Sequence, residues 1–95
     1  MTVVRRADVV EAPMSVRDVE SLVSSSAAGA VVTFSGDVRD HDHGRSVAHL
    51  EYEGHPTAAA VLAEVAREVA ERHDVIAIAV LHRVGPLKIG ESALV

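Results

Sequence analysis

Residues 29–45, GAVVTFSGDVRDHDHGR, join an apolar stretch to a charged one. Ala30 to Phe34 are small, β-branched or aromatic, and such a run predicts a strand that is buried on both faces. The strand is expected to end at Gly36. The loop that follows carries charged or imidazole side chains at Asp37, Arg39, Asp40, His41, Asp42, His43 and Arg45. A charged loop on a stiff strand is a common way to present a binding group.

The rest of the chain predicts a small α+β domain. Hydrophobic periodicity, capping residues and turn residues indicate a strand at Val3–Val10, a short helix after Ser15, a half-exposed strand at Val47–Glu53, an amphipathic helix at Thr57–His73, an apolar strand at Val75–Val84, a turn at Gly85-Pro86 to Gly90, and a strand that begins at Glu91. The expected order is β-α-β-β-α-β-β with an incomplete last strand. Both helices are expected on one side of a mainly antiparallel sheet.

Composition restricts the classes of function. The 95 residues predict a single domain, 1–95, whose core is built from Val, Ala and Leu because the chain has one Phe, one Tyr and no Trp. The absence of cysteine excludes thiolate catalysis and Cys-zinc sites, and a cytoplasmic location is expected. A net charge of -5 argues against general nucleic-acid binding. No apolar run approaches the roughly 20 residues of a membrane helix.

Arg39 is the strongest candidate for a binding residue. It follows the predicted buried strand, and its guanidinium suits bidentate binding of a phosphate or carboxylate. The alternative is a solvated arginine that pairs with Asp37 or Asp40.

Three other sets of polar residues have simpler explanations. Asp40 to His43 alternate carboxylates and imidazoles, which are metal ligands, but alternation in an extended loop points neighbouring side chains apart. His82-Arg83 is a possible acid-base or anion-binding pair, yet its position where a strand emerges into solvent explains it as well. Lys88 is most simply a surface charge in a turn. These residues alone do not define a reaction.

Three segments together resemble one family. Residues 29–39, GAVVTFSGDVR, resemble the glycine-to-arginine signature of the large, catalytic subunit of molybdopterin synthase. Residues 50–53, LEYE, with the helix after Pro56, resemble the next strand and long helix of that family. Residues 82–87, HRVGPL, with Gly90-Glu91, resemble its following strand and turn.

The resemblance implies an enzyme of molybdenum-cofactor synthesis with an α/β hammerhead fold. Such subunits transfer sulfur to cyclic pyranopterin monophosphate and so form the dithiolene of molybdopterin. The sulfur arrives as a thiocarboxylate on the C-terminal Gly-Gly tail of a small ubiquitin-like subunit, and the large subunits form a homodimer. The resemblance implies no cofactor and no resident metal.

The resemblance also implies site residues. Asp37, Val38 and Arg39 fall on the substrate-binding loop of the family, although a basic residue is frequent where this chain has Asp37. The family's His-Arg pair and lysines follow the strand that begins at Glu91, beyond Val95. The catalytic residues are therefore not assigned in this sequence, and we expect an N-terminal portion of a longer subunit that is inactive by itself.

Two alternatives from other classes stay open at this point. One is a regulatory module with a ferredoxin-like core that binds a metal or small molecule through Asp40 to His43. The other is a dimerisation domain without a ligand.

Overall fold

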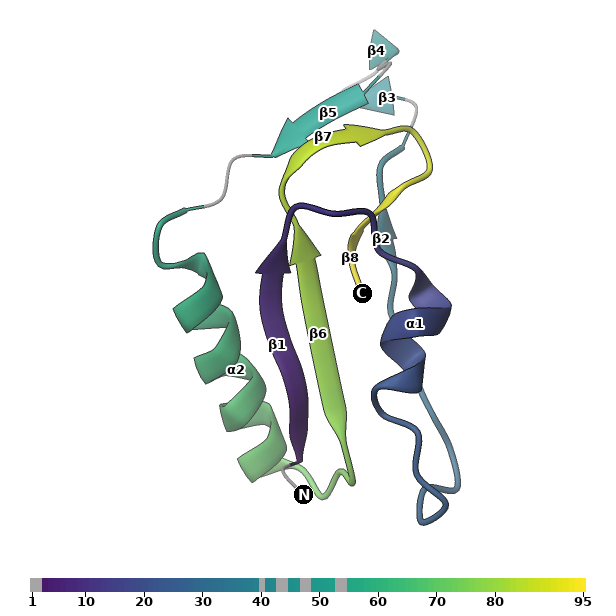
Figure 1. Cartoon of the computed structure of the whole chain (residues 1–95), viewed down its shortest axis with the longest axis vertical. Helices are drawn as coiled ribbons and strands as arrows, with labels where there is room; N and C mark the ends of the chain where they lie inside the picture. The colour runs from purple at the N-terminus through teal and green to yellow at the C-terminus, as the bar shows by residue number, and fades with distance from the viewer. Residues whose placement is uncertain (1–2, 40, 43–44, 47–48, 53–54) are drawn as a thin grey trace.

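The computed structural model describes residues 3–39, 41–42, 45–46, 49–52 and 55–95 (Figure 1). Its elements are β1 (Val4–Val10), α1 (Val16–Ser21), β2 (Gly36–Asp37), β3 (His41–Asp42), β4 (Arg45–Ser46), β5 (His49–Tyr52), α2 (Ala58–Arg72), β6 (Ile78–Arg83), β7 (Gly85–Lys88) and β8 (Ser92–Leu94). The predicted α+β class with two helices is confirmed.

The main sheet has the strand order β1-β6-β8-β2. Strand β8 pairs antiparallel with both β6 and β2, and the short pairs β3-β4 and β5-β7 are antiparallel as well. The longest ladder, β1 with β6, is parallel. The sheet is therefore mixed, with antiparallel pairs in the majority among the described strands.

Both helices begin where the sequence predicts. The hydroxyl of Ser15 accepts a hydrogen bond from the backbone N–H of Asp18 at 3.4 Å, which caps α1. Thr57 is the N-cap residue of α2, and its N–H donates to the ring Nδ1 of His55 at 3.2 Å. No helix in the described part of the chain is long and apolar enough to cross a membrane.

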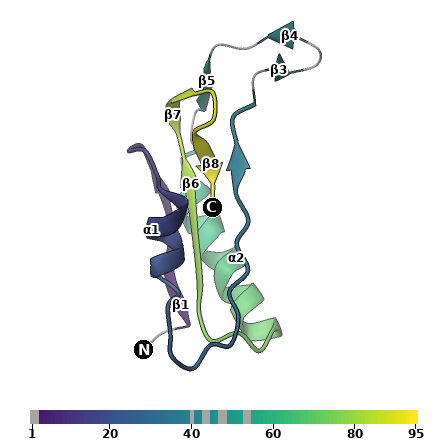
Figure 2. The same cartoon turned by 90° about the vertical axis from the view of Figure 1, so that its right-hand side faces the viewer.

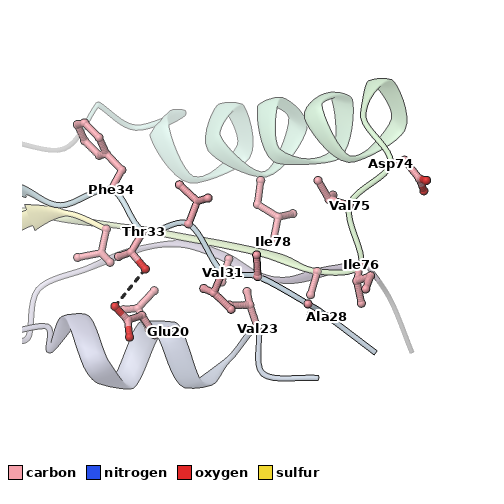
Figure 3. A pocket seen from close by; sticks show the side chains of 17 residues that line it. Glu20, Val23, Ala28, Val31, Thr33, Phe34, Asp74, Val75, Ile76 and Ile78 are labelled. Carbon is pink, nitrogen blue, oxygen red and sulfur yellow. Dashed lines mark hydrogen bonds between the residues drawn. The ribbon is translucent and has the colours of Figure 1, made fainter. Parts of the chain in front are cut away.

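The prediction that both helices cover one side of the sheet is wrong. Figures 2 and 3 show α1 and α2 on opposite faces of β6. Val19 of α1 packs with Leu81 of β6 and with Val95 in one buried cluster, while α2 contacts β1 and β6 from the other face. The reason lies in β6, whose residues Ile78 to Leu81 are all apolar, so that both of its faces need covering.

The prediction of a buried strand at Ala30–Phe34 is also wrong. Residues 30–35 are exposed and form no ladder, and the exposed fraction is 96% for Val32 and 69% for Phe34. Only Gly36 and Asp37 pair, with Leu94 and Ser92 of β8. Residues 30–35 stay uncovered because no described strand lies beside them.

The predicted turn at Gly85-Pro86 is instead the start of strand β7. Gly85, with φ of 93°, redirects the chain from β6 into β7, which pairs with β5. Gly90, with φ of 84°, forms the turn into β8. Both glycines adopt the left-handed region, which other residues enter only at a cost in free energy.

Candidate functional site

Val38 anchors the predicted binding loop to the body of the domain. Its N–H donates to the carbonyl oxygen of Glu91 at 2.9 Å, and its own carbonyl oxygen accepts from the N–H of Gly90 at 2.8 Å. Its side chain is 4% exposed and packs with Leu87 and Ala93. The backbone and the side chain of Val38 are therefore both engaged within the domain, and Val38 fixes the position of its two neighbours.

Asp37 and Arg39 flank this anchor and are exposed. Side chains alternate along extended backbone, so burial of Val38 turns both neighbours toward solvent. The Asp37 carboxylate accepts from the hydroxyl of Ser35 at 2.6 Å and from that of Ser92 at 3.0 Å. The planar guanidinium of an arginine can form two parallel hydrogen bonds to a phosphate or carboxylate, so Arg39 has the chemistry of an anion-binding residue.

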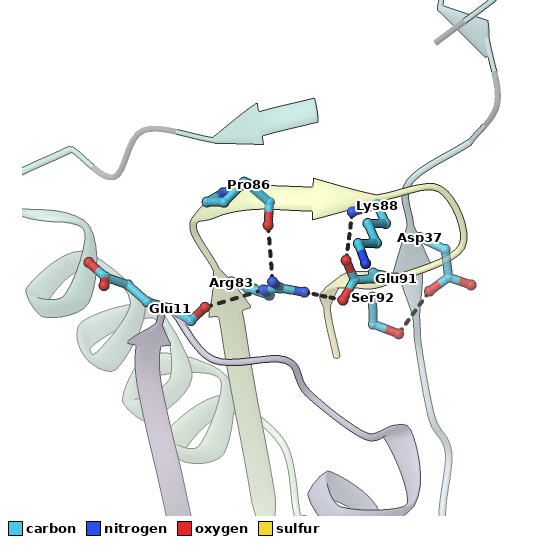
Figure 4. Close-up of polar contacts among 7 residues, drawn as sticks. All are labelled: Glu11, Asp37, Arg83, Pro86, Lys88, Glu91 and Ser92. Atoms are coloured by element: carbon cyan, nitrogen blue, oxygen red, sulfur yellow. Dashed lines mark hydrogen bonds and ion pairs between the residues drawn. The ribbon is translucent and has the colours of Figure 1, made fainter. Parts of the chain in front are cut away.

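Among the residues whose burial the structure describes, Arg83 is the buried charged side chain, with an exposed fraction of 6%. Figure 4 shows its guanidinium between three partners from different segments. It donates to the Glu91 carboxylate at 2.5 Å, to the carbonyl oxygen of Pro86 at 3.0 Å and to that of Glu11 at 3.4 Å. The interpretation of Arg83 as a residue emerging into solvent is wrong, because these three acceptors meet at the end of β6.

Glu91 joins this network to the binding loop. One oxygen of its carboxylate accepts from the N–H of Lys88 at 2.6 Å, the other from Arg83, and its carbonyl oxygen holds Val38. The N–H of Lys88 and the guanidinium of Arg83 lower the pKa of the Glu91 carboxyl below its usual value. The turn from β7 to β8 is thus tied on one side to buried Arg83 and on the other to Val38.

The other predicted polar residues do not join this site. Asp40 and His43 lie outside the described residues, so the Asp40 to His43 tract is not described as a whole. Within the described part of the chain, no group of three or more His, Cys, Asp or Glu residues is placed to hold a metal ion. His82 donates from Nδ1 to the carbonyl oxygen of Ala93 at 2.9 Å, which supports the pairing of β6 with β8.

Comparison with known protein families shows which family the chain belongs to. The family profile described as MoaE protein matches residues 9–95. The chain belongs to the MoaE protein family. The match includes all three segments whose resemblance the sequence analysis identified.

Individual relatives of the MoaE chain agree with this assignment. It is 35% identical over 91 residues to the molybdopterin synthase catalytic subunit of Bacillus subtilis, covering 95% of this chain and 58% of that protein. It is 37% identical over 84 residues to molybdopterin synthase catalytic subunit 1 of Mycobacterium tuberculosis, covering 87% of this chain and 57% of that protein. The chain therefore spans a little over half the length of these relatives.

A solved structure extends the agreement to the fold. The crystal structure of molybdopterin synthase from Staphylococcus aureus superposes with a TM-score of 0.78 at 30% sequence identity, covering 93% of this chain and 65% of that chain. The MoaE fold that the resemblance implied is thus confirmed for most of the 95 residues.

Sequence reasoning missed the bond between Arg83 and Glu91. The signal was present, because an arginine at the end of an apolar strand is followed, after a turn with two glycines, by a glutamate. A pair on either side of a turn is a candidate for a hydrogen bond that closes it. The burial of the Arg83 guanidinium could not be predicted from the sequence, because it depends on the backbone carbonyl groups of Glu11 and Pro86, whose positions only the fold determines.

The Glu91 carboxyl predicts a pH dependence of stability in this MoaE chain. The pKa of Glu91 is lowered in the folded state. The contribution of its carboxylate to the free energy of unfolding is therefore fully present above the unfolded-state pKa of about 4.5, and it is lost as the pH falls through the folded-state pKa. We expect the difference in unfolding free energy between the natural chain and Glu91→Gln to shrink below about pH 4.5. Urea unfolding across this range measures it.

The matched control for this measurement is Glu64→Gln, on the exposed face of α2. Its difference from the natural chain should be small at every pH, because no hydrogen bond to Glu64 is expected to be lost. A difference for Glu91→Gln that is constant between neutral and acidic pH would show that the carboxylate form of Glu91 contributes nothing to stability.

Proposed function

We propose that the full-length subunit to which this chain corresponds is the catalytic subunit of a molybdopterin synthase. It transfers sulfur from the thiocarboxylated Gly-Gly tail of a small ubiquitin-like subunit to cyclic pyranopterin monophosphate, and the product carries the dithiolene. The observation that carries the proposal is the family match over residues 9–95. The geometry supports it, because the loop that we propose to bind the substrate is held at Val38 and exposes Arg39.

The proposal assigns each loop residue a role. Arg39 binds the substrate phosphate or stabilises the negative charge that develops on the pterin, since a guanidinium forms two charge-assisted hydrogen bonds at once. Val38 holds the loop. Asp37 contributes through its backbone, because its carboxylate accepts from two serine hydroxyls and would repel an anionic substrate. The chemical step needs the family's lysines, which match no residue of this chain.

Assembly and location belong to the same proposal. The small subunit inserts its tail into the large subunit, and two large subunits form a homodimer. The step takes place in the cytoplasm, and nucleic acid has no part in it. The net charge of -5 supports the last statement.

Reconstitution tests this function. We expect the full-length subunit, mixed with thiocarboxylated small subunit and cyclic pyranopterin monophosphate, to form molybdopterin that mass spectrometry detects. The 95-residue chain should form none under the same conditions, because a lysine amine that engages the thiocarboxylate carbonyl is missing. A small subunit with a plain carboxylate tail is the control. Absence of product from the full-length subunit would refute the proposed function.

A further inference from the structure

A small polar cluster lies beside Arg39, where β2 pairs with β8. Ser35, Asp37 and Ser92 form this Asp37 cluster. The hydroxyls of Ser35 and Ser92 donate to the same carboxylate oxygen of Asp37, Oδ1, at 2.6 and 3.0 Å. The two hydroxyl oxygens are 3.3 Å apart. Figure 4 shows the hydrogen bond that joins Ser92 to Asp37. The carboxylate is therefore held in one place by two segments of the chain.

The pairing of β2 with β8 explains why these side chains share a face. Asp37 is the ladder partner of Ser92, and Ser35 lies two residues before Asp37. Side chains alternate between the two faces of a strand, so residues two apart and residues directly opposite point the same way. The following residues of both segments, Val38 and Ala93, are buried together on the other face. The position of the Asp37 cluster is thus fixed by the sheet.

The same alternation places Arg39 on the face of Asp37. Val38, between them, is buried, whereas both neighbours are exposed. Two residues of extended backbone span about 6–7 Å, so a phosphate held by the Arg39 guanidinium would lie on the order of 10 Å from the Asp37 carboxylate. The Debye length is about 10 Å at 0.1 M salt, so the two negative charges would still repel each other.

The negative charge of Asp37 is not compensated by its partners. Hydroxyl groups are neutral donors. In the part of the chain that the structure describes, no cationic side chain forms an ion pair with Asp37. Coulomb repulsion is proportional to the charge of the ligand, so a doubly charged anion at Arg39 is opposed about twice as strongly as a singly charged one.

We propose that Asp37 determines the charge of the phosphate that the substrate loop accepts. Its fixed carboxylate makes the loop select a singly charged phosphate diester over a doubly charged phosphate monoester. The inference rests on the proposed function, because it takes a phosphate as the ligand of Arg39. It also narrows the substrate class: a cyclic monophosphate is a diester with a single negative charge, whereas a monoester carries close to two charges at pH 8.

The two serines are positioning residues for this selection. An arginine and an aspartate two residues apart on one strand can pair with each other, as Arg6 and Asp8 do at 3.3 Å on β1. Such a pair at Asp37 and Arg39 would occupy the guanidinium. The hydroxyl of Ser92 instead holds the Asp37 carboxylate toward β8. The carboxylate therefore repels an anion without closing the site.

The isosteric substitution Asp37→Asn tests the charge. The asparagine carbonyl oxygen can accept from both serines, so the geometry is kept while the charge is removed. The full-length subunit is titrated at pH 8 with methyl phosphate, a monoester, and with dimethyl phosphate, a diester, and the amide signals of Val38 and Arg39 report binding. We expect Asp37→Asn to improve binding of methyl phosphate relative to dimethyl phosphate by roughly two- to fourfold at about 0.1 M salt.

Two controls separate this effect from a general change in charge. Near 1 M salt the Debye length is about 3 Å, so the difference between the natural subunit and Asp37→Asn should disappear. Glu64→Gln also removes one negative charge, on the exposed side of α2, and should leave the ratio of the two dissociation constants unchanged.

Substitution of both serines tests their positioning role. Ser35→Ala combined with Ser92→Ala frees the carboxylate to pair with Arg39, so both esters should bind roughly twofold more weakly. Ser35→Thr combined with Ser92→Thr keeps the two hydroxyls and should restore the binding of both esters. Weaker binding that threonine does not restore would show that the hydroxyls have no positioning role.

The charge selection is overturned if Asp37→Asn leaves the ratio of the two dissociation constants unchanged, if its effect is the same near 1 M salt, or if the amide signals of Val38 and Arg39 respond to neither ester. Formation of molybdopterin in the reconstitution is a separate measurement. A subunit that forms molybdopterin while its ester ratio ignores Asp37 would contradict the charge selection alone. A subunit that selects the diester but forms no product would contradict the proposed function alone.

Discussion

Replacing Arg39 with alanine in the full-length subunit is expected to lower kcat/KM for cyclic pyranopterin monophosphate by roughly ten- to a hundredfold. Charge-assisted hydrogen bonds to an ionised group contribute on the order of 1.5–3 kcal/mol, and about 1.4 kcal/mol corresponds to a factor of ten. The fold should be unaffected, because Arg39 is exposed while the buried anchor is Val38. Initial rates with saturating thiocarboxylated small subunit, together with the melting temperature, measure both effects.

Two further variants separate the geometry of Arg39 from its charge. Arg39→Lys should recover only part of the lost activity, because lysine keeps the charge but not the planar pair of donors. Arg67→Ala, on the exposed side of α2, is the matched control and should leave kcat/KM unchanged. An Arg39→Ala enzyme with full activity would remove this residue from the substrate site.

Local signals in the sequence predicted the helices and most strands. The cap at Ser15 and the apolar stripe of α2 depend on residues within a few positions of each other, and both helices begin within a residue or two of the predicted place. Strand β6 was predicted for the same reason, because its apolar run is continuous.

The misplaced features depend on distant residues. Ala30 to Phe34 have the composition of a buried strand, but burial needs a neighbouring strand, and β8 pairs with this segment only as far as Gly36. The parallel ladder of β1 with β6 and the placement of the helices on two faces likewise depend on segments far apart in the sequence.

In the candidate site, too, features that depend on neighbouring residues were predicted, and features that depend on distant residues were not. The charged character of the loop that carries Arg39 followed from the residues themselves, whereas the buried strand expected before it at Ala30–Phe34 is absent from the described structure. The burial of Val38 could not be predicted, because its side chain packs with Leu87 and Ala93, which are distant in the sequence. Asp40 and His43 of the metal-binding alternative lie outside the described residues, so this alternative stays a hypothesis.

Removing the buried guanidinium is expected to have the largest effect on the stability of the 95-residue chain. Arg83→Met keeps a long apolar side chain but leaves the carbonyl oxygens of Glu11 and Pro86 without this donor. At roughly 1 kcal/mol for each of these two hydrogen bonds, the free energy of unfolding should fall by at least about 2 kcal/mol, because the bond to Glu91 is lost as well. For a domain of this size, such a loss lowers the melting temperature by about 10 °C. Arg67→Met, at an exposed position, should change it by less than about 2 °C.

The same substitution should also loosen the substrate loop. Arg83 holds the side chain of Glu91, and the carbonyl oxygen of Glu91 holds the N–H of Val38. We therefore expect Arg83→Met to speed amide exchange at Val38 more than at Val80 in β6, and Glu91→Gln to do the same without removing a buried arginine. The two substitutions act on one network, so their combined effect on the unfolding free energy should be smaller than the sum of the single effects. Strictly additive effects, or exchange at Val38 that follows only the global unfolding, would mean that the buried pair and the loop are independent. If the coupling is found, the arginine at the end of β6 positions Arg39 without touching the substrate, through a single glutamate that closes the turn between β7 and β8.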